Sequence, residues 1–277
     1  MSLRIALVSL LLSSLSLAEP LKELRIDYAT YNPSSLVLKK FGWLEESLGR
    51  DGTKVTWLFS QGSNKANELL SSGSADLAST AGAAALLART NGVPLKVVYV
   101  YSKPEWTALV VPKGSPVKSV AELKGKKIAA TRGTDPFFFL LRTLQASGLK
   151  QSDVELVNLQ HPDGRTALER GQVDAWAGLD PHLAASELQA GSRILFRNID
   201  FNTFGTLNAR EEFLTSHPEA LRTVLDRDVG VPGEKLRAAL AAVVPILRSE
   251  KLAAPGADPE KALSELLAPG PAQEARR

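Results

Sequence analysis

The sequence predicts an α/β protein made of two lobes of similar construction. A seven-residue unit occurs twice, at residues 72–78 and 170–176, and its glycine and aspartate lie 98 positions apart in the two copies. Each copy leads from a helix-like stretch through a turn into a short apolar strand. Strands and helices alternate on both sides of the turn-rich residues 112–116, which is typical of mostly parallel sheets flanked by helices. Two such halves leave a cleft between them, where small ligands usually bind.

The first 18 residues have the pattern of a secretory signal peptide. Arg4 supplies the positive start, residues 5–17 the apolar run, and Ala18 ends a small-x-small cleavage site. The apolar run is shorter than the ~20 residues of a spanning helix and contains serines, so we expect cleavage after Ala18 rather than a membrane anchor. Removing 18 residues from 277 leaves 259, and because Arg4 is the only charged residue removed, the net charge falls from +3 to +2.

The composition fits an exported protein without disulfides. Because the chain has no cysteine, thiol catalysis, cysteine metal sites and an N-terminal lipid-modified cysteine are excluded. The 44% hydrophobic content is enough for the cores of two modest lobes. The small, scattered net charge argues against a nucleic-acid partner. We therefore expect a periplasmic protein that is not a lipoprotein.

Residues 19–110 are predicted to form the first part of lobe 1. Apolar and polar residues alternate over 24–30 as in a strand, and Asn32 then opens a helix that ends at Gly49. The same patterns predict strands at 55–59, 77–79, 95–101 and 107–111, and helices at 64–72 and 82–90.

Lobe 2 is predicted over residues 111–200. It contains a helix over 136–147 with Pro136 in its first turn. Its other elements are strands at 127–131, 154–158, 175–179 and 194–196, and helices at 119–123, 164–170 and 181–189. Residues 201–277 return to lobe 1, where helices at 211–216, 218–228, 233–250 and 258–267 are expected to wrap the lobe before a charged, proline-rich tail.

Small polar residues gather where predicted strands give way to helices. Helix N-termini direct unsatisfied N–H groups into the crevice at the carboxyl ends of the strands, which suits an oxyanion without a metal. Ordinary helix capping is the alternative at each junction. The candidate junctions are 32–35, 61–64, 79–82 and 132–135, and 79–82 is the most favourable because its small side chains allow close backbone approach.

Arg132 and Asp135 make opposite predictions about the charge of the ligand. The Arg132 guanidinium either grips an anionic headgroup or is a solvated surface cation. Asp135 stands at a helix N-terminus, where it either repels an oxyanion or holds a cationic group. The substitution Asp135→Ser separates these alternatives by a gain of anion affinity or a loss of the natural ligand.

Aromatic residues and one histidine complete the candidate site. At least one ring of residues 137–139 is expected to face the cleft, and Phe137 is the candidate. Trp106 and Trp176 are either cleft or core residues. Asp180 and His182 correspond to the Ser79 junction of the first lobe, so His182 is expected to line the cleft unless it is a surface or capping residue.

The usual sequence signatures of enzymes are missing. The chain has no Gly-x-Ser-x-Gly elbow, no phosphate loop and no dinucleotide-binding glycine motif. Its histidines, His161, His182 and His217, lack metal-ligand spacing. We therefore expect a binding protein without a cofactor or metal.

Four segments together resemble the periplasmic solute-binding proteins of ABC importers for sulfonate, nitrate and taurine, most closely the aliphatic sulfonate-binding branch. The resemblance covers residues 24–225, with a further helical match at 252–267. The segments are 69–81 (LLSSGSADLASTA), 115–128 (SPVKSVAELKGKKI), 127–144 with its Gly133-Thr134 turn, and 165–184 (RTALERGQVDAWAGLDPHLA).

This resemblance implies the type II periplasmic-binding fold, with two lobes joined by two hinge strands that close on the ligand. It also implies a monomer that docks on a membrane permease. Carried over by position, the ligand would meet Asn32, Ser34, Gln61, Gly62, Ser63, Ser79, Thr80, Trp106, Gly133, Thr134, Asp135, Asp180 and His182.

Departures from the family pattern leave the chemical identity of the ligand undecided. Many relatives have a small hydroxyl residue where Asp135 stands and an aromatic where His182 stands, and they carry more helical turns between Asp228 and Gly233. An aliphatic sulfonate is the first hypothesis, followed by taurine, nitrate, or an amine or heteroaromatic compound such as a thiamine-precursor pyrimidine. An enzyme on this fold is the remaining alternative, but the enzymatic relatives depend on cysteine, which this chain lacks.

Overall fold

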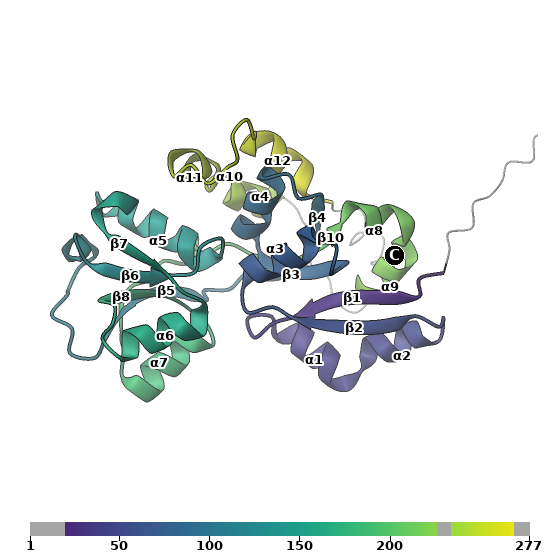
Figure 1. Cartoon of the computed structure of the whole chain (residues 1–277), viewed down its shortest axis with the longest axis horizontal. Helices are drawn as coiled ribbons and strands as arrows, with labels where there is room; N and C mark the ends of the chain where they lie inside the picture. Colours follow the sequence, from purple (N-terminus) through teal and green to yellow (C-terminus); the bar gives the residue numbers. More distant parts are fainter. Residues whose placement is uncertain (1–19, 226–233, 269–277) are drawn as a thin grey trace, which may run out of the picture.

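The computed structural model describes residues 20–225 and 234–268, which form two α/β lobes side by side (Figure 1). The sheet of lobe 1 contains β1 Glu23–Tyr28, β2 Lys54–Phe59, β3 Leu77–Ala81, β4 Leu95–Ser102 and β10 Gly205–Arg210, in the order β2-β1-β3-β10-β4. The sheet of lobe 2 contains β5 Thr107–Val111, β6 Lys127–Ala130, β7 Glu155–Asn158, β8 Ala175–Leu179 and β9 Arg193–Phe196, in the order β7-β6-β8-β5-β9. The equivalent orders confirm the prediction of two similarly built lobes. The expected signal peptide lies outside the described residues.

Each sheet is mixed, whereas the sequence predicted mostly parallel sheets. Strand β1 runs parallel to β2 and β3, but β10 is antiparallel to β3 and β4. In lobe 2, β6 runs parallel to β7 and β8, but β5 is antiparallel to β8 and β9. Both β5 and β10 enter their sheet directly from the other lobe. Without a helical crossover of the kind that parallel neighbours need, they run antiparallel.

The chain crosses between the lobes twice, from β4 to β5 and from β9 to β10. Because β5 pairs with β8 and β9, residues 107–111 belong to the sheet of lobe 2. The crossing therefore comes before the turn-rich residues 112–116, where the sequence predicts the boundary between the lobes. Residues 103–106 form the first connection, and residues 197–204 form the second.

The repeated seven-residue unit builds the same turn in both lobes. Gly73 and Gly171 have φ of +71° and +67°, a left-handed conformation that glycine adopts without steric strain. Three residues later, the N–H groups of Asp76 and Asp174 donate to the carbonyls of Arg25 and Lys127 at 2.8 Å. The two carboxylates accept from the N–H groups of the same partners at 2.9 Å. The unit therefore aligns β3 with β1 and β8 with β6, which is a structural role.

The two aspartates offer a matched test of this role. Asp76 is buried and pairs with Arg25 and Arg210, whereas the side chain of Asp174 is 40% exposed. Asp76→Ala is expected to lower the free energy of unfolding by about 2–4 kcal/mol, because it leaves buried donors without an acceptor. Asp174→Ala is expected to cost about 1 kcal/mol or less, since water replaces the lost partner. Urea unfolding of both variants checks this, and equal losses would contradict it.

Helices cover both faces of each sheet. In lobe 1, α1 Pro33–Phe41 and α2 Trp43–Gly49 lie on one face, and α4 Gly82–Thr90 and α12 Pro259–Leu266 lie on the other (Figure 1). The sequence predicted one helix from Asn32 to Gly49, but Gly42, at φ +64°, ends α1 and starts α2. The remaining helices are α3 Ser63–Ser71, α5 Asp135–Ala146, α6 His161–Glu169, α7 His182–Ala190, α8 Glu211–Ser216, α9 Pro218–Leu225, α10 Glu234–Ala241 and α11 Val244–Ser249.

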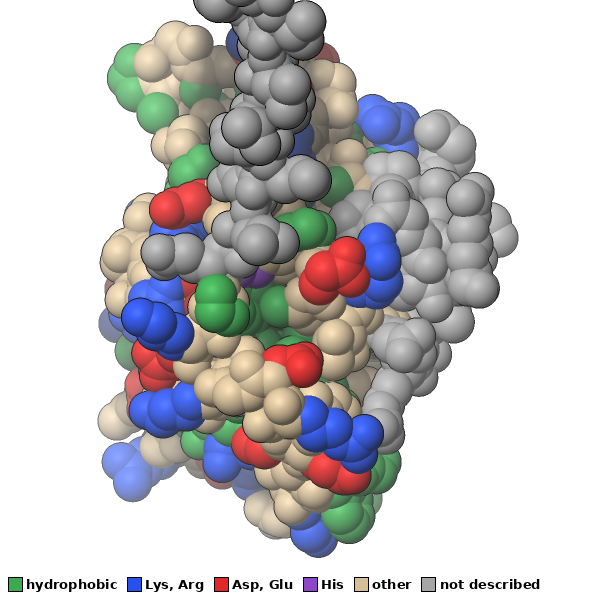
Figure 2. Space-filling view, turned by 90° about the vertical axis from the view of Figure 1, so that its right-hand side faces the viewer, with side chains coloured by type: hydrophobic (Ala, Val, Ile, Leu, Met, Phe, Trp, Pro, Cys, Tyr) green, Lys and Arg blue, Asp and Glu red, His purple; other side chains and the backbone are tan. Residues whose placement is uncertain are grey.

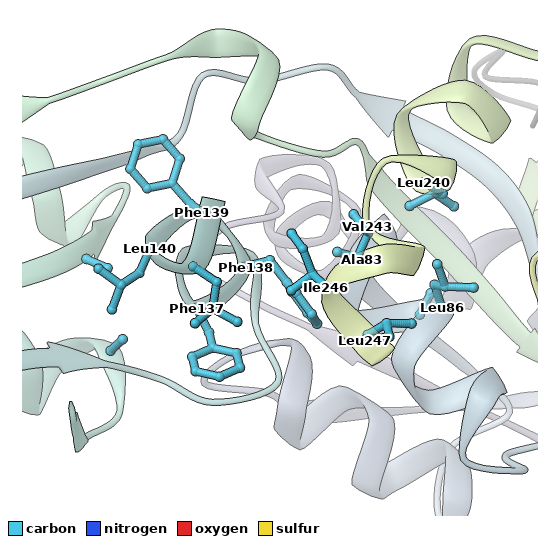
Figure 3. Close-up of a cluster of buried hydrophobic side chains, with 14 of the residues drawn as sticks. Ala83, Leu86, Phe137, Phe138, Phe139, Leu140, Leu240, Val243, Ile246 and Leu247 are labelled. Atoms are coloured by element: carbon cyan, nitrogen blue, oxygen red, sulfur yellow. The ribbon is translucent and has the colours of Figure 1, made fainter. Parts of the chain in front are cut away.

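A hydrophobic cluster joins the C-terminal helices to both lobes. It contains side chains of α4 from lobe 1, α5 from lobe 2, and α10, α11 and α12. In Figure 3, Phe138 of α5 lies on the side that faces Ile246 of α11. Phe137, Phe138 and Phe139 are all buried in this cluster, so the expectation that one ring faces the cleft is not met. The three rings point in different directions (Figure 3), and each finds an apolar neighbour because α5 packs between the sheet of lobe 2 and the helices α4 and α11.

None of the described helices is long and apolar enough to cross a bilayer.

Candidate functional site

A buried polar cluster lies where the strands of lobe 1 end. Asp27 of β1 is fully buried, and its carboxylate accepts hydrogen bonds from the Ser60 hydroxyl at 2.5 Å and from the Ser79 N–H and hydroxyl at 2.7 and 2.9 Å. The Asn32 amide donates to the Ser79 hydroxyl at 2.7 Å. The Tyr31 hydroxyl donates to the Ser79 carbonyl at 2.9 Å. The structure thus brings Asn32 and Ser79, two predicted site residues, into one network.

Burial raises the pKa of Asp27 to about 6 from an ordinary value of 3.8, against the opposing effect of its hydrogen bonds to Ser60 and Ser79. Between pH 4 and 6, the folded protein keeps a proton that the unfolded chain loses, so stability falls as the pH rises through this window. Asp27→Asn cannot ionise. We expect the unfolding free energy of the wild type, relative to this variant, to fall by about 2–3 kcal/mol between pH 4 and pH 7. Urea unfolding at each pH measures it, and a flat difference would contradict the assignment.

Ser34 extends the cluster to the surface. It is exposed in the first turn of α1, whose N-cap is Asn32. Ser34, Asn32 and Ser79 also line a cavity of 340 Å³ that continues into lobe 1 beneath α1. In the first turn of α1, Pro33 has no N–H and the Ser35 N–H is bonded to Asn32, so Ser34 and the positive end of the helix dipole are what suit this end of the cavity to an anion.

A second cluster ties the two connections between the lobes to α5. The carboxylate of Asp135 accepts from the Trp106 indole N–H at 2.7 Å, from the Thr203 N–H at 2.9 Å and from the Thr203 hydroxyl at 2.6 Å. Trp106 lies on the first connection and Thr203 on the second. Burial raises the pKa of Asp135, and these hydrogen bonds oppose the rise. Asp135 is therefore engaged by protein donors on both oxygens, which the sequence could not show.

Trp106 connects this hinge cluster with the polar cluster of lobe 1. Its ring meets Tyr31 edge-on, with ring centroids 6.4 Å apart. Its carbonyl accepts from the Asp180 N–H at 2.9 Å, and the Asp180 carboxylate caps α7 by accepting from the Ala184 N–H at 3.1 Å. The Asp180–Pro181 peptide bond is cis. Trp106 and Asp180, both predicted site residues, thus lie close together at the hinge.

The lobes touch where the N-termini of α3 and α6 meet. A Cβ atom at Gly62 would lie 3.1 Å from His161 Nε2, and one at Gly133 would lie 3.6 Å from Asn64 Cβ. His161 is buried, and its Nε2 has no hydrogen-bond partner among the described residues. Burial lowers the pKa of His161 to about 3, so the ring is neutral at neutral pH. Gly62 and Gly133, both predicted site residues, therefore line the interface between the lobes.

The junction that the sequence favoured most, residues 79–82, is occupied by the protein itself. The Gly82 N–H donates to the Phe204 carbonyl at 2.8 Å, and the Ala83 N–H donates to the Thr203 hydroxyl at 3.2 Å. Thr80 points to the sheet face opposite Ser79, where the Asn208 amide donates to its hydroxyl at 2.8 Å. The small side chains admit the hinge segment closely, so this junction offers the ligand Ser79 alone.

The remaining predicted residues fall into two groups. Ser63, Thr134 and Phe137 are buried, and the two hydroxyls are bonded to the Ala81 N–H and the Thr131 carbonyl. Gln61 and Arg132 are exposed, and His182 is partly buried at the start of α7. Desolvation lowers the pKa of His182. The sequence left Trp176 as either a cleft or a core residue. In the structure it is fully buried in the core of lobe 2.

Sequence reasoning missed three residues that organise these clusters. Asp27 stands at a polar position of the alternating stretch 24–30, which does not distinguish it from a surface residue, and its only signal is a carboxylate near the end of β1. His161 was missed because the helix was predicted to start at residue 164, whereas α6 begins at His161. Thr203 lies in a connection without a recognisable pattern, so no local signal marks it.

The described residues contain no grouped metal ligands, and the surface of lobe 1 carries charges of both signs (Figure 2). Within residues 20–225 and 234–268, no three His, Asp or Glu side chains lie together as metal ligands would. On the face of lobe 1 shown in Figure 2, basic and acidic side chains lie interspersed. This distribution agrees with the small net charge of the chain.

Comparison with known sequences places the chain among binding proteins. The family model described as NMT1/THI5 like matches residues 39–226. The protein named "Putative aliphatic sulfonates-binding protein" of Escherichia coli (strain K12) is 34% identical over 198 residues, which are 71% of this chain and 60% of that protein. The taurine-binding periplasmic protein of the same strain is 28% identical over 62% of this chain and 54% of its own length. The chain thus matches 60% or less of the length of these curated relatives.

Solved structures agree with this placement. The alkanesulfonate-binding protein SsuA from Xanthomonas axonopodis pv. citri, bound to MOPS, is 28% identical, with a TM-score of 0.69 over 92% of this chain and 83% of its own. The periplasmic aliphatic sulphonate binding protein SsuA from Escherichia coli is 29% identical, with a TM-score of 0.63 over 92% and 78%. The desulfurization enzyme DSZB, at 13% identity and a TM-score of 0.65, shares the fold alone. The relatives at 28% identity or more are binding proteins, not enzymes. The chain therefore belongs to the NMT1/THI5-like family of two-lobed periplasmic binding proteins.

Proposed function

We propose that this protein captures an aliphatic sulfonate between its lobes, outside the cytoplasm, and delivers it to the permease of an ABC importer. The observation that carries the proposal is the polar mouth at the N-terminus of α1, formed by Asn32, Ser34 and Ser79 beside the junction of the lobes. Relatives with this fold are described as binding alkanesulfonates or aliphatic sulfonates.

The mouth suits a sulfonate because a tetrahedral oxyanion needs several hydrogen-bond donors and no metal. The exposed Ser34 supplies its hydroxyl and its backbone N–H as donors, since Pro33 has no N–H and the Ser35 N–H is bonded to Asn32, and the helix dipole favours negative charge there. Asn32 is held by its hydrogen bond to Ser79, so its position is fixed before the ligand arrives. The three hydrogen bonds that the Asp27 carboxylate accepts direct the positive ends of their dipoles at its charge, which lessens its repulsion of the anion.

Capture would end with closure of the lobes about the two connections. Lobe 2 brings Gly133 and the neutral His161 to Gly62 and Asn64 of lobe 1. The N-termini of α3 and α6 face each other at this contact, and both are the positive ends of their helices. A bound anion near them would offset this repulsion and favour the closed form.

Delivery outside the cytoplasm is part of the proposal. The two relatives described as periplasmic are a taurine-binding and an aliphatic sulphonate-binding protein. The permease is the partner that a released ligand requires to cross the membrane. Export by cleavage after Ala18 remains the prediction of the sequence.

A thermal-shift screen tests the proposed ligand. Methanesulfonate, butanesulfonate, taurine and nitrate are added to the full chain, and a true ligand is expected to raise the melting temperature in a concentration-dependent way. At about 100 times its Kd, a ligand stabilises the folded state by about 2.7 kcal/mol. Acetate and butanoate serve as charge-matched controls. If no sulfonate raises the melting temperature, or if the carboxylates raise it equally, the sulfonate assignment fails.

A further inference from the structure

An apolar chamber lies inside lobe 1, behind the polar mouth. It is the inner part of the 340 Å³ cavity whose outer part is the mouth, and it lies between α1 and the sheet, with α9 at its side. Ile26, Trp57 and Leu207 form its floor on β1, β2 and β10, and Val224 of α9 forms part of its wall. Its polar residues are at one end, where Asn32 and Ser34 stand. The chamber and the proposed anion mouth are therefore one continuous space.

The size of the chamber indicates what it holds. An apolar cavity of about 150 Å³ stays dry and binds benzene, so a cavity of 340 Å³ has room for a group of that size behind an anion at the mouth. A chamber lined by aromatic and aliphatic side chains gains packing contacts only from an apolar occupant. Nitrate or methanesulfonate at the mouth would leave nearly all of it unfilled.

The polar groups beside the chamber are Asp27 and Tyr101, and neither presents a free charge to an occupant. Both Asp27 oxygens accept hydrogen bonds from Ser60 and Ser79, so this carboxylate has little capacity left for an ammonium group. The Tyr101 side chain also lines the chamber, but its hydroxyl oxygen is buried and has no hydrogen-bond partner among the described residues.

We infer that the ligand is an amphiphilic organosulfonate whose apolar part, at least as large as one ring or a six-carbon chain, enters this chamber of lobe 1. This inference rests on the proposed function, because the mouth must first hold the sulfonate. Lobe 1 then binds both ends of the ligand, and lobe 2 closes over the mouth. Taurine fits poorly, since its ammonium group would enter apolar surroundings without a free carboxylate.

Isothermal titration calorimetry of the full chain with methane-, butane-, hexane- and octanesulfonate tests the inference. Each methylene that enters the chamber is expected to raise the affinity about three- to fourfold, so hexanesulfonate binds at least 100-fold more tightly than methanesulfonate. Taurine is expected to bind more weakly than butanesulfonate. Hexanoate is included to separate the contribution of the chain from that of the sulfonate.

The outcomes distinguish the inference from the function on which it rests. Equal affinity for all four sulfonates would overturn the inference and leave the proposed function standing. Tight binding of hexanoate with no binding of any sulfonate would overturn the sulfonate assignment, and the inference with it.

A variant whose chamber is partly filled provides a second test of the inference. Leu207→Phe adds bulk to its floor and is expected to flatten the series, so hexanesulfonate gains no more than about threefold over methanesulfonate. Leu188→Phe, at a position 86% exposed on α7 of lobe 2, is the matched control and should keep the full series. If Leu207→Phe keeps the full series as well, the chains bind elsewhere and the inference fails. The series on the unsubstituted protein decides the question even if this variant does not fold.

Discussion

Asp135→Ala is expected to lower the free energy of unfolding by about 3–5 kcal/mol. The substitution leaves the Trp106 indole N–H, the Thr203 N–H and the Thr203 hydroxyl without their acceptor in a buried site. Each unsatisfied buried donor costs about 1–3 kcal/mol, although neighbouring losses do not add fully. The loss also frees both connections between the lobes from α5. Urea unfolding measures the free energy, and small-angle scattering measures the spread of lobe orientations.

Asp135→Asn is the matched control for this prediction. Its amide oxygen keeps an acceptor in the same shape, so the expected loss is about 1–2 kcal/mol. The two variants separate a structural carboxylate from one that touches the ligand. A ligand-contacting role predicts a large change in affinity with little change in stability. A loss below about 1 kcal/mol in Asp135→Ala would contradict the structural role.

Gly62→Val is expected to weaken ligand binding about 5- to 150-fold while lobe 1 stays folded. The Cβ atom alone would lie 2.8 Å from Asn64 Oδ1 and 3.1 Å from His161 Nε2, so the valine methyl groups hold the lobes apart. Overpacking of this kind costs about 1–3 kcal/mol, and closure of the lobes must supply it. The backbone of Gly62, at φ −173°, accepts any residue, so strain at the position itself is not the cause.

Calorimetric titration with the best sulfonate measures this effect. Gly49→Val serves as the control, because a Cβ atom there meets nothing within 4 Å. Unchanged affinity in Gly62→Val would show that this contact between the lobes does not form part of the bound state. Equal weakening in both variants would point to a general loss of stability instead.

Local pattern was enough to predict most of the fold. The strands at 107–111 and 175–179 and the helices at 82–90 and 211–216 have the predicted bounds, because apolar runs and turn residues mark them in the sequence. The 98-residue repeat predicted equivalent sheets since it encodes the same turn twice. The antiparallel direction of β5 and β10 was not predictable in this way. It arises because each of these strands enters its sheet directly from the other lobe, and local pattern does not show where the chain crosses between the lobes.

The candidate site was predictable in place but not in detail. Asn32, Ser34 and Ser79 were recognised as polar residues at strand ends, and the structure brings them to one mouth. The roles of Asp27 and Asp135 depend on partners 29 to 68 residues away, which no local pattern specifies. The chamber arises where α1, α2, α9 and the five strands of lobe 1 fail to fill the space between them, and side-chain packing of this kind leaves no signal in residue spacing.

The most direct test is a crystal structure of the protein grown with methanesulfonate. The account predicts the sulfonate between the lobes, with its oxygens at the first turn of α1 beside Asn32 and Ser34, and with Gly62 and His161 in contact across the closed interface. A sulfonate bound only on the outer surface, or an empty mouth at a ligand concentration that raises the melting temperature, would contradict it.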